Sequence, residues 1–520
     1  TAKQQTAAEE RAERWKGGAL QGEAVPAADW VSDPDRLAAP VRGARPGPGT
    51  SFVLPQPLCS PEALGSAIFR KRYGLRYAYV AGGMYRGVAS ADMVVRMGRA
   101  GMLGFLGAGG MRLEEVASSV DSIRSGLADG QAYGVNLLAD HNRPDRERRL
   151  VDLCLGKGVK IVEAAAFLQM TPALVLYRLR GLRREPSDEI RCDHRILAKL
   201  SRREVAEAFM SPAPQALVRD LLEQGAVTAE QAQLAEHVPM SHDLCVEADS
   251  GGHTDSGVAT ILLPAMLLLR DKMQQRYGYG ESICMGMAGG IGTPGAAAAA
   301  FTMGAYFILT GSINQCTVES GAAESVKDML QGAGIHDMAY APAGDMFEMG
   351  AKVQVLKKGL LFPMRASRLH ALYTHYSGLE DIPVQEREKL ERSVFRRTFE
   401  DIWQECLLYL EKNGRGEEAE SAKTSPKVRM ARVFKWYFSY ATDLSFREHT
   451  DDPVNRQIHT GPALGAFNQW VAGTGLESWR SRHVDAIALH LLEATSKHLS
   501  EHLSEHLGRV SGRFAATDPQ

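Results

Sequence analysis

The sequence lacks the features that mark a membrane or exported protein. Its formal net charge of -2 gives no electrostatic argument for nucleic acid or anionic membranes as partners. The longest nearly apolar stretch, 257–269, contains Pro264 and is shorter than the roughly 18 residues that a membrane span needs. The N-terminus has no apolar segment, so we do not expect it to be a signal peptide.

Cysteine motifs are also lacking. The seven cysteines are scattered, with no C-x-x-C pair and no spacing typical of metal ligands. An odd, dispersed set in a large chain fits reduced thiols, and we expect a cytoplasmic protein without a metal site. Cys245 and Cys284 fall within predicted strands, where a thiol usually acts as a small buried hydrophobic group.

From residue 77 onward, short apolar runs alternate with helical patterns. The predicted strands are 77–81, 102–106, 133–138, 160–165, 194–200, 243–248, 282–287 and 305–309. Eight strand–helix units over about 250 residues predict a (β/α)8 TIM barrel, an α/β fold. We expect three regions. They are an irregular N-terminal segment (1–75), the barrel (76–330, with a helical insertion near 213–237) and a helical C-terminal extension (331–520).

Three predicted strands end in turns rich in glycine and small polar residues. The turn residues are Gly251 and Gly252, Gly289 and Gly290, and Gly311 and Ser312. The C-terminal ends of parallel barrel strands meet at one face, so these backbone amides can surround a phosphate. Residues 290–295 also fit the dinucleotide pattern G-x-G-x-x-G. The next strand, however, ends without the carboxylate that a Rossmann unit places on the ribose, which favours the barrel.

Other strand ends add groups that suit a flat ligand. Gly82, Gly83 and Met84 follow the first strand, Asn136 lies in the third and Lys199 in the fifth. Small residues let a flat ring approach the backbone, and the amide and ammonium groups can donate to ring carbonyls or a ribityl chain. With the phosphate turns, this set predicts FMN as the cofactor. The glycines can also serve only tight turns, and Lys199 can simply pair with an acidic neighbour.

Longer stretches around these residues resemble a known family. Residues 247–253, Glu-Ala-Asp-Ser-Gly-Gly-His, resemble the E-A-G-G-H signature of nitronate monooxygenase-like flavoproteins, lengthened here by Asp249 and Ser250. Within that superfamily, the chain resembles the trans-acting enoyl reductases of polyketide and polyunsaturated fatty acid synthases. The matching stretches are 79–90, 310–319, 340–359 and 461–468, within a resemblance that covers about 60–495.

The resemblance implies an FMN-dependent oxidoreductase that takes electrons from NADPH. Its substrate is an enoyl thioester on an acyl carrier protein, with hydride delivered to Cβ and a proton to Cα. His253, in a Gly-Gly-His turn at the predicted mouth, is the candidate catalytic residue. Its imidazole can act as the proton donor or as a contact to the thioester oxygen. We expect the extension to bind the carrier protein and substrate, with a homodimer as one option for the assembly.

Basic residues in the extension form two clusters that can steer an acidic carrier protein. They are Arg392, Arg396 and Arg397, and Lys427, Arg429, Arg432 and Lys435. The same residues can also be an ordinary solvated helix face. Three other functions stay open from the sequence: a nitronate monooxygenase, a catalytically silent docking subunit of a synthase, and a sugar-phosphate enzyme on the same fold.

Overall fold

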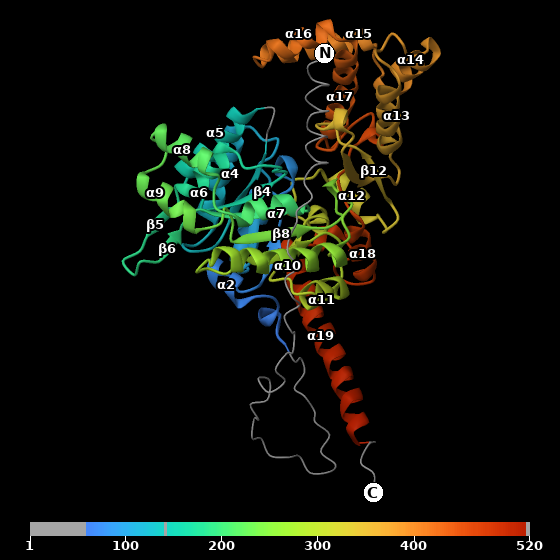
Figure 1. The fold of residues 1–520 in the computed structure, drawn as a ribbon. Helices are drawn as coiled ribbons and strands as arrows, with labels where there is room; N and C mark the ends of the chain where they lie inside the picture. The colour runs from blue at the N-terminus through green and yellow to red at the C-terminus, as the bar shows by residue number, and fades with distance from the viewer. Residues whose placement is uncertain (1–58, 140–142, 516–520) are drawn as a thin grey trace, which may run out of the picture. The chain divides into compact units, whose positions relative to one another are not determined.

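Eight parallel strands form a closed barrel in the computed structural model, which describes residues 59–139 and 143–515 (Figure 1). Around the barrel the order is β1, β11, β10, β8, β7, β4, β3 and β2. The strands are β1 Tyr79–Ala81, β2 Leu103–Leu106, β3 Gly134–Leu138, β4 Ile161–Ala165, β7 Arg195–Leu200, β8 Asp243–Glu247, β10 Cys284–Ala288 and β11 Ile308–Thr310. Each overlaps a predicted strand, which confirms the barrel and excludes the Rossmann alternative. Cys245 and Cys284 are buried in β8 and β10, as predicted.

Helices cover the outside of the barrel. Those between consecutive strands are α3 Ala91–Arg99, α4 Leu113–Gly126, α5 Pro144–Gly156, α6 Pro172–Leu179, α7 Arg203–Met210, α10 Ala259–Tyr277 and α11 Pro294–Thr302. The remaining place is taken by α19, Val484–Ala515, which contacts both α11 and α3 (Figure 1). Its Ile487 and Leu491 belong to the hydrophobic core of the barrel. Segment 311–483 therefore lies in the chain between the last barrel strand and the last barrel helix.

Helix α2, Ala67–Tyr73, closes the N-terminal end of the barrel. Tyr73 donates a hydrogen bond to Asp243 at the start of β8, 2.7 Å away, and Arg72 pairs with the same carboxylate. Phe69 stacks on Phe307 with ring centroids 4.1 Å apart. This helix lies inside the predicted irregular segment 1–75, of which residues 1–58 are outside the described part of the chain.

The connections of the barrel carry two additions. Helices α8 (Gln215–Glu223) and α9 (Ala229–Leu234) lie in the predicted helical insertion near 213–237. A hairpin of β5 (Leu182–Arg184) and β6 (Ile190–Cys192) follows α6 and was not predicted from the sequence. Its strands have only three residues each, which is too short for a period of two to be recognised.

A small antiparallel sheet stands beside the mouth of the barrel. It pairs β12 (Met338–Pro342) with β13 (Lys352–Leu356), and β13 with β9 (Gly252–Thr254) from the loop after β8. The extension, which we expect to be mostly helical, forms strands over 338–342 and 352–356. Alternating Val353 and Val355 in β13 favour a strand, because β-branched side chains fit a pleated surface.

The rest of segment 311–483 is helical. Helices α13 Phe362–His375, α14 Val384–Leu390, α15 Phe399–Lys412, α16 Gly416–Thr424 and α17 Pro426–Leu444 surround a second hydrophobic core. Aromatic rings fill that core, as in the edge-to-face pair of Phe347 and Phe438 with centroids 5.3 Å apart. Helices α12 (Glu324–Gln331) and α18 (Pro462–Trp470) pack closer to the barrel. Within the described ranges, no helix is long and apolar enough to cross a bilayer.

Candidate active site

Apart from His253, the predicted site residues lie at the C-terminal ends of the barrel strands or in the turns that follow them. Strands β8, β10 and β11 are neighbours, so the three glycine-rich turns that follow them are adjacent. Strand β4 lies four strands away from β11 in either direction around the barrel, and β3 is opposite β10 in the same way. Asn136 in β3 therefore lies across the mouth from the glycine-rich turn after β10.

A buried carboxylate organises the β3–β4 side. Asn136 Nδ2 donates to Glu163 Oε2 at 2.6 Å, and the backbone amide of Gly83 donates to the same oxygen at 2.9 Å. Glu163 is 0% exposed, and its Oε1 has no hydrogen-bond partner among the described residues. Burial raises the pKa of Glu163, while the charge of Lys199 and the two hydrogen bonds act against the rise. Glu163 was not among the predicted site residues; its signal was an acidic residue inside an otherwise apolar strand.

Gly82 and Gly83 are glycines because side chains from other strands approach them closely. A Cβ on Gly83 would lie 2.5 Å from the Cβ of Asn136 and 2.8 Å from Glu163 Oε2. A Cβ on Gly82 would lie 2.7 Å from Leu309 Cδ2. Met84 is half-buried, and its carbonyl oxygen occupies the space where Gly107 would carry a side chain. These residues shape the wall of the site.

Lys199 forms an ion pair with one carboxylate at the mouth and feels the charge of a second. Its Nζ lies 3.2 Å from Glu247 Oε1 at the end of β8. Lys199 therefore does pair with an acidic neighbour, which was the simpler of its two interpretations from the sequence. Burial alone would lower the pKa of Lys199, but the charges of Glu247 and Glu163 outweigh it and raise the pKa above its ordinary value. Ser250 donates to the same Glu247 oxygen at 3.2 Å. A fixed cation thus stands between the two sides of the mouth.

The β10–β11 side offers open backbone. In the part of the chain that the structure describes, no atom beyond the adjoining residues lies within 4 Å of the positions where Gly290 and Gly311 would carry a Cβ, so both turns leave room for a ligand. Gly289 and Gly290 have φ values of +89° and +76°, which turn the chain sharply after β10. Pro294 begins α11. Free space beside glycine amides suits the phosphate of a nucleotide-like cofactor.

A distant segment crosses all three turns. The amide of Gly461 donates to Ser312 Oγ at 3.1 Å, and a Cβ on Gly251 would lie 2.6 Å from the backbone of Thr460. A Cβ on Gly292 would lie 2.0 Å from the carbonyl oxygen of Ala463. Gly251 and Ser312 therefore support the packing of this segment, in addition to any contact with a ligand.

His253 lies in strand β9, where it pairs with Val353, and not in a free turn. Its Nε2 is 2.8 Å from Asp345 Oδ1, and the two side chains are 49% and 65% exposed. Burial would lower the pKa of His253, but the hydrogen bond and the charge of Asp345 outweigh it and raise the pKa. A second histidine, His459, lies with its Nδ1 3.4 Å from the Cβ position of Gly252. Burial and the nearby His253 lower the pKa of His459 to about 4.

Sequence reasoning found neither Asp345 nor His459. They are separated from His253 by 92 and 206 residues, and no local pattern links them. The only signal was the family resemblance of 340–359 and 461–468, which includes or adjoins both residues.

The donor set at the mouth fits FMN. Open glycine turns on one side can accept a phosphate, and Asn136, Lys199 and the unpaired oxygen of Glu163 on the other side can bond the polar edge of a ring. A sugar phosphate would leave the distant β3–β4 side without a partner. The arrangement therefore suits a long ligand with a phosphate at one end and hydrogen-bonding groups at the other.

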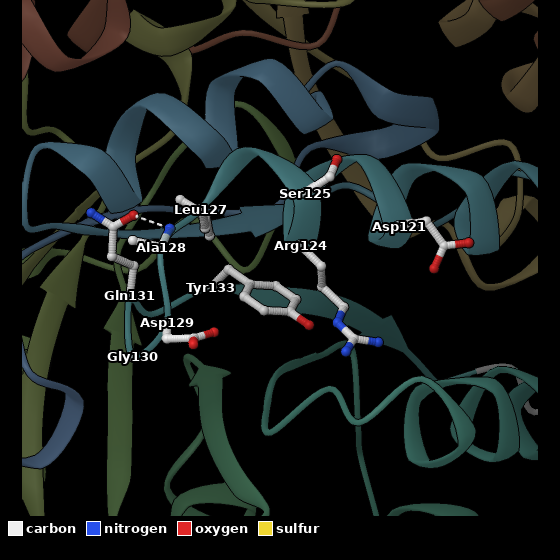
Figure 2. Close-up of a pocket in the computed structure, with 9 residues that line it drawn as sticks. All are labelled: Asp121, Arg124, Ser125, Leu127, Ala128, Asp129, Gly130, Gln131 and Tyr133. Atoms are coloured by element: carbon white, nitrogen blue, oxygen red, sulfur yellow. Dashed lines mark hydrogen bonds between the residues drawn. The ribbon is translucent and has the colours of Figure 1, made fainter.

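A separate hollow of about 410 Å³ opens at the opposite end of β3 (Figure 2). Its lining residues are Asp121, Arg124, Ser125, Leu127, Ala128, Asp129, Gly130, Gln131 and Tyr133. Tyr133 directly precedes β3, so the hollow is at the N-terminal face of the barrel, opposite the face that carries the active sites of this fold. It contains no predicted site residue.

The basic clusters of the extension are largely paired within the protein. Their partners are Asp452 for Arg396, Glu405 for Arg397, Glu400 for Arg429, Glu418 for Arg432, Glu348 for Lys435 and two backbone carbonyls for Lys427. Paired charges project a weaker positive field than the sequence alone suggests.

Comparison with known proteins identifies relatives over most of the chain. The enoyl reductase domain of MlnA, from the macrolactin biosynthesis cluster of Bacillus amyloliquefaciens, is 43% identical and superposes with a TM-score of 0.82. The match covers 85% of this chain and 99% of that domain. Residues 376–455 match the inserted helical domain of acyl-carrier-protein S-malonyltransferase.

Two curated proteins match over similar ranges. The polyketide biosynthesis protein PksE of Bacillus subtilis is 51% identical over 435 residues, which are 84% of this chain and 56% of that protein. A polyunsaturated fatty acid synthase polypeptide of Thraustochytrium is 41% identical over 422 residues, which are 81% of this chain and 28% of that polypeptide. The chain thus spans about half, or less, of the length of these curated relatives.

Proposed function

The chain belongs to the family of trans-acting enoyl reductases of polyketide and polyunsaturated fatty acid synthases, and we propose that it reduces enoyl thioesters carried on an acyl carrier protein. FMN is the proposed cofactor and NADPH the proposed reductant. One observation carries this function: the open glycine turns of β10 and β11 lie across the barrel mouth from a buried polar cluster on β3 and β4. A flat cofactor with a phosphate tail uses both sides.

The chain's own residues would hold this cofactor at both ends. We expect the amides of Gly290 and Gly311 and the hydroxyl of Ser312 to bond the phosphate, and Asn136 and Lys199 to bond the ring. When bound, FMN supplies hydride transfer between a nicotinamide and Cβ of the substrate. The fixed charge of Lys199 favours electron-rich groups at the ring, because a buried cation acts in a medium of low dielectric constant.

His253 is the proposed acid at the substrate. Asp345 engages its Nε2, which leaves Nδ1 as the nitrogen that can contact the substrate, and keeps the imidazole protonated to a higher pH. A protonated Nδ1 can stabilise the negative charge that develops on the thioester oxygen, or deliver the proton to Cα. Asp345 orients the ring and holds its proton.

We propose that helices α13–α17, which surround the second hydrophobic core, form the docking region for the carrier protein. Residues 376–455 resemble a domain of an enzyme that acts on an acyl carrier protein, which supports this assignment. Because most basic residues of the predicted clusters are paired internally, we expect docking to depend less on them than their number suggests.

The first test is the visible spectrum of the purified protein under anaerobic conditions, after reconstitution with FMN. Bleaching of the flavin by NADPH, and its return on addition of an enoyl thioester, are the expected results. Fast oxygen-dependent turnover of a nitronate, with no response to the thioester, would favour a nitronate monooxygenase. A protein that binds no flavin would contradict the proposal and favour a silent docking subunit.

A further inference from the structure

Glu163 has one carboxylate oxygen that receives no hydrogen bond from the described residues, in the interior of the barrel. Its side chain is 0% exposed, and both of its donors, Asn136 Nδ2 and the Gly83 amide, use Oε2. Oε1 lies 3.2 Å from the Cβ position of Gly82 and has no hydrogen-bond partner within the described ranges. A buried carboxylate oxygen without a donor is costly, so a ligand that brings a donor would remove that cost.

We propose that Glu163 binds the imide N–H at the pyrimidine edge of the flavin ring through its free Oε1, and so fixes the ring end of the cofactor at β3–β4. This inference rests on FMN as the cofactor of the proposed function. It adds a residue that the strand-end glycines and Asn136 do not by themselves indicate.

Position around the barrel supports the assignment. β4 is opposite β11, and the turn after β11 is one of the open phosphate turns. A cofactor whose phosphate lies at that turn reaches the far side of the mouth with the end of its ring, and not with the hydroxyls next to the phosphate. The group nearest Glu163 is then the imide, which is the N–H donor of an oxidised flavin ring.

Hydrogen-bond polarity supports it as well. Because Oε2 receives two donors, it must act as an acceptor in any protonation state. An ionised Glu163 then presents an acceptor at Oε1, which matches an N–H. A protonated Glu163 would present a donor there, which matches a ring carbonyl instead. The nearby ammonium of Lys199 favours the ionised form.

Glu163→Gln separates these two states. The glutamine oxygen must take the place of Oε2, because a second donor there would oppose Asn136 and Gly83, so its NH₂ group points where Oε1 was. That group opposes an imide N–H but mimics a protonated acid. We expect Glu163→Gln to bind FMN at least about tenfold more weakly than the wild type. Glu147→Gln is the control, because Glu147 is also a buried carboxylate but lies on helix α5, where it accepts a hydrogen bond from Thr171 at the start of α6.

A modified ligand tests the same contact from the other partner. FMN methylated at the imide nitrogen has no N–H there, so the wild type should bind it at least about tenfold more weakly than FMN, and Glu163→Gln should discriminate little. Thermal unfolding of the flavin-free proteins should show Glu163→Gln at least as stable as the wild type, since it removes a buried charge. A purely structural role would instead lower that stability and leave discrimination unchanged.

The outcomes separate the inference from the proposed function. Equal FMN affinity in the wild type and Glu163→Gln, or equal binding of the methylated flavin by the wild type, overturns the role of Glu163 while enoyl reduction stands. FMN binding with the expected discrimination but no enoyl reduction overturns the proposed reaction alone. A wild type that binds no FMN overturns both.

Discussion

Two glycines that follow neighbouring strands at the barrel mouth are needed for opposite reasons. After β1, Gly83 is enclosed: a Cβ there would lie 2.5 Å from Asn136 and 2.8 Å from Glu163. After β11, Gly311 has no atom of the described residues within 4 Å of the same position. The first glycine permits the protein to pack against itself, and the second leaves space for something else. Glycine at a strand end is therefore not a measure of ligand contact.

The largest effect is expected for Gly83→Ala. The new methyl group collides with Asn136 and Glu163, and overpacking of this kind costs about 1–3 kcal/mol. The free energy of unfolding of the flavin-free protein, measured with urea, should fall by that amount. FMN binding should fall as well, because both displaced side chains belong to the proposed ring site. Unchanged stability of flavin-free Gly83→Ala would show that Asn136 and Glu163 can move away from the methyl group. Gly83 and Gly311 would then not differ in the way described above.

Gly311→Ala tests the open glycine. A methyl group at Gly311 meets no atom of the described residues within 4 Å, so the flavin-free protein should keep its stability within about 0.5 kcal/mol. FMN affinity should drop about tenfold, because a methyl group keeps the phosphate away from the amide. Riboflavin, which has no phosphate, is the control ligand and should lose little affinity. Equal losses for both flavins would contradict a phosphate site at this turn.

The fold was predictable from the sequence because its signal is local. Each barrel strand is a short buried run, and the (β/α) alternation repeats it eight times. The site was predictable only where glycines and Asn136 mark the strand ends. Glu163 was missed because its hydrogen bonds come from Gly83 after β1 and Asn136 in β3. These contacts depend on the closure of the barrel, which the sequence around Glu163 does not indicate.

Long-range contacts explain the other omissions. Helix α19 completes the barrel after a long insertion, and its apolar face looks like that of any surface helix. Asp345 reaches His253 because β13 pairs with β9, a contact between strands about 100 residues apart. The basic clusters of the extension looked unpaired in the sequence for the same reason. The acidic partners of Arg396 and Lys435 come from other segments.

Asp345→Asn is expected to move the pH dependence of the reaction. The charge of Asp345 raises the pKa of His253, so removing it lowers that pKa. If protonated His253 is the active form, the rate falls as pH rises through this pKa, and the fall should begin at lower pH in Asp345→Asn. The measurement is kcat/KM against pH with an enoyl thioester. His253→Gln cannot titrate, so its rate should not fall in this pH range. An unchanged pH profile in Asp345→Asn would mean that the His253–Asp345 pair does not take part in the reaction.

His459 should have little effect on stability at neutral pH, and its pKa is shifted in the opposite direction to that of its neighbour His253. Its pKa is about 4 in the folded protein and about 6.5 in an unfolded chain, so the unfolded state binds more protons between these values. Stability should therefore be full above about pH 6.5 and decline as pH falls toward 4. His459→Gln removes that contribution, so its free energy of unfolding should fall less steeply than that of the wild type over this window. Unfolding by urea at several pH values measures both slopes. Parallel slopes for the wild type and His459→Gln would mean that His459 has the same pKa in the folded protein as in the unfolded chain. His253 and His459 would then not differ in charge in the way proposed.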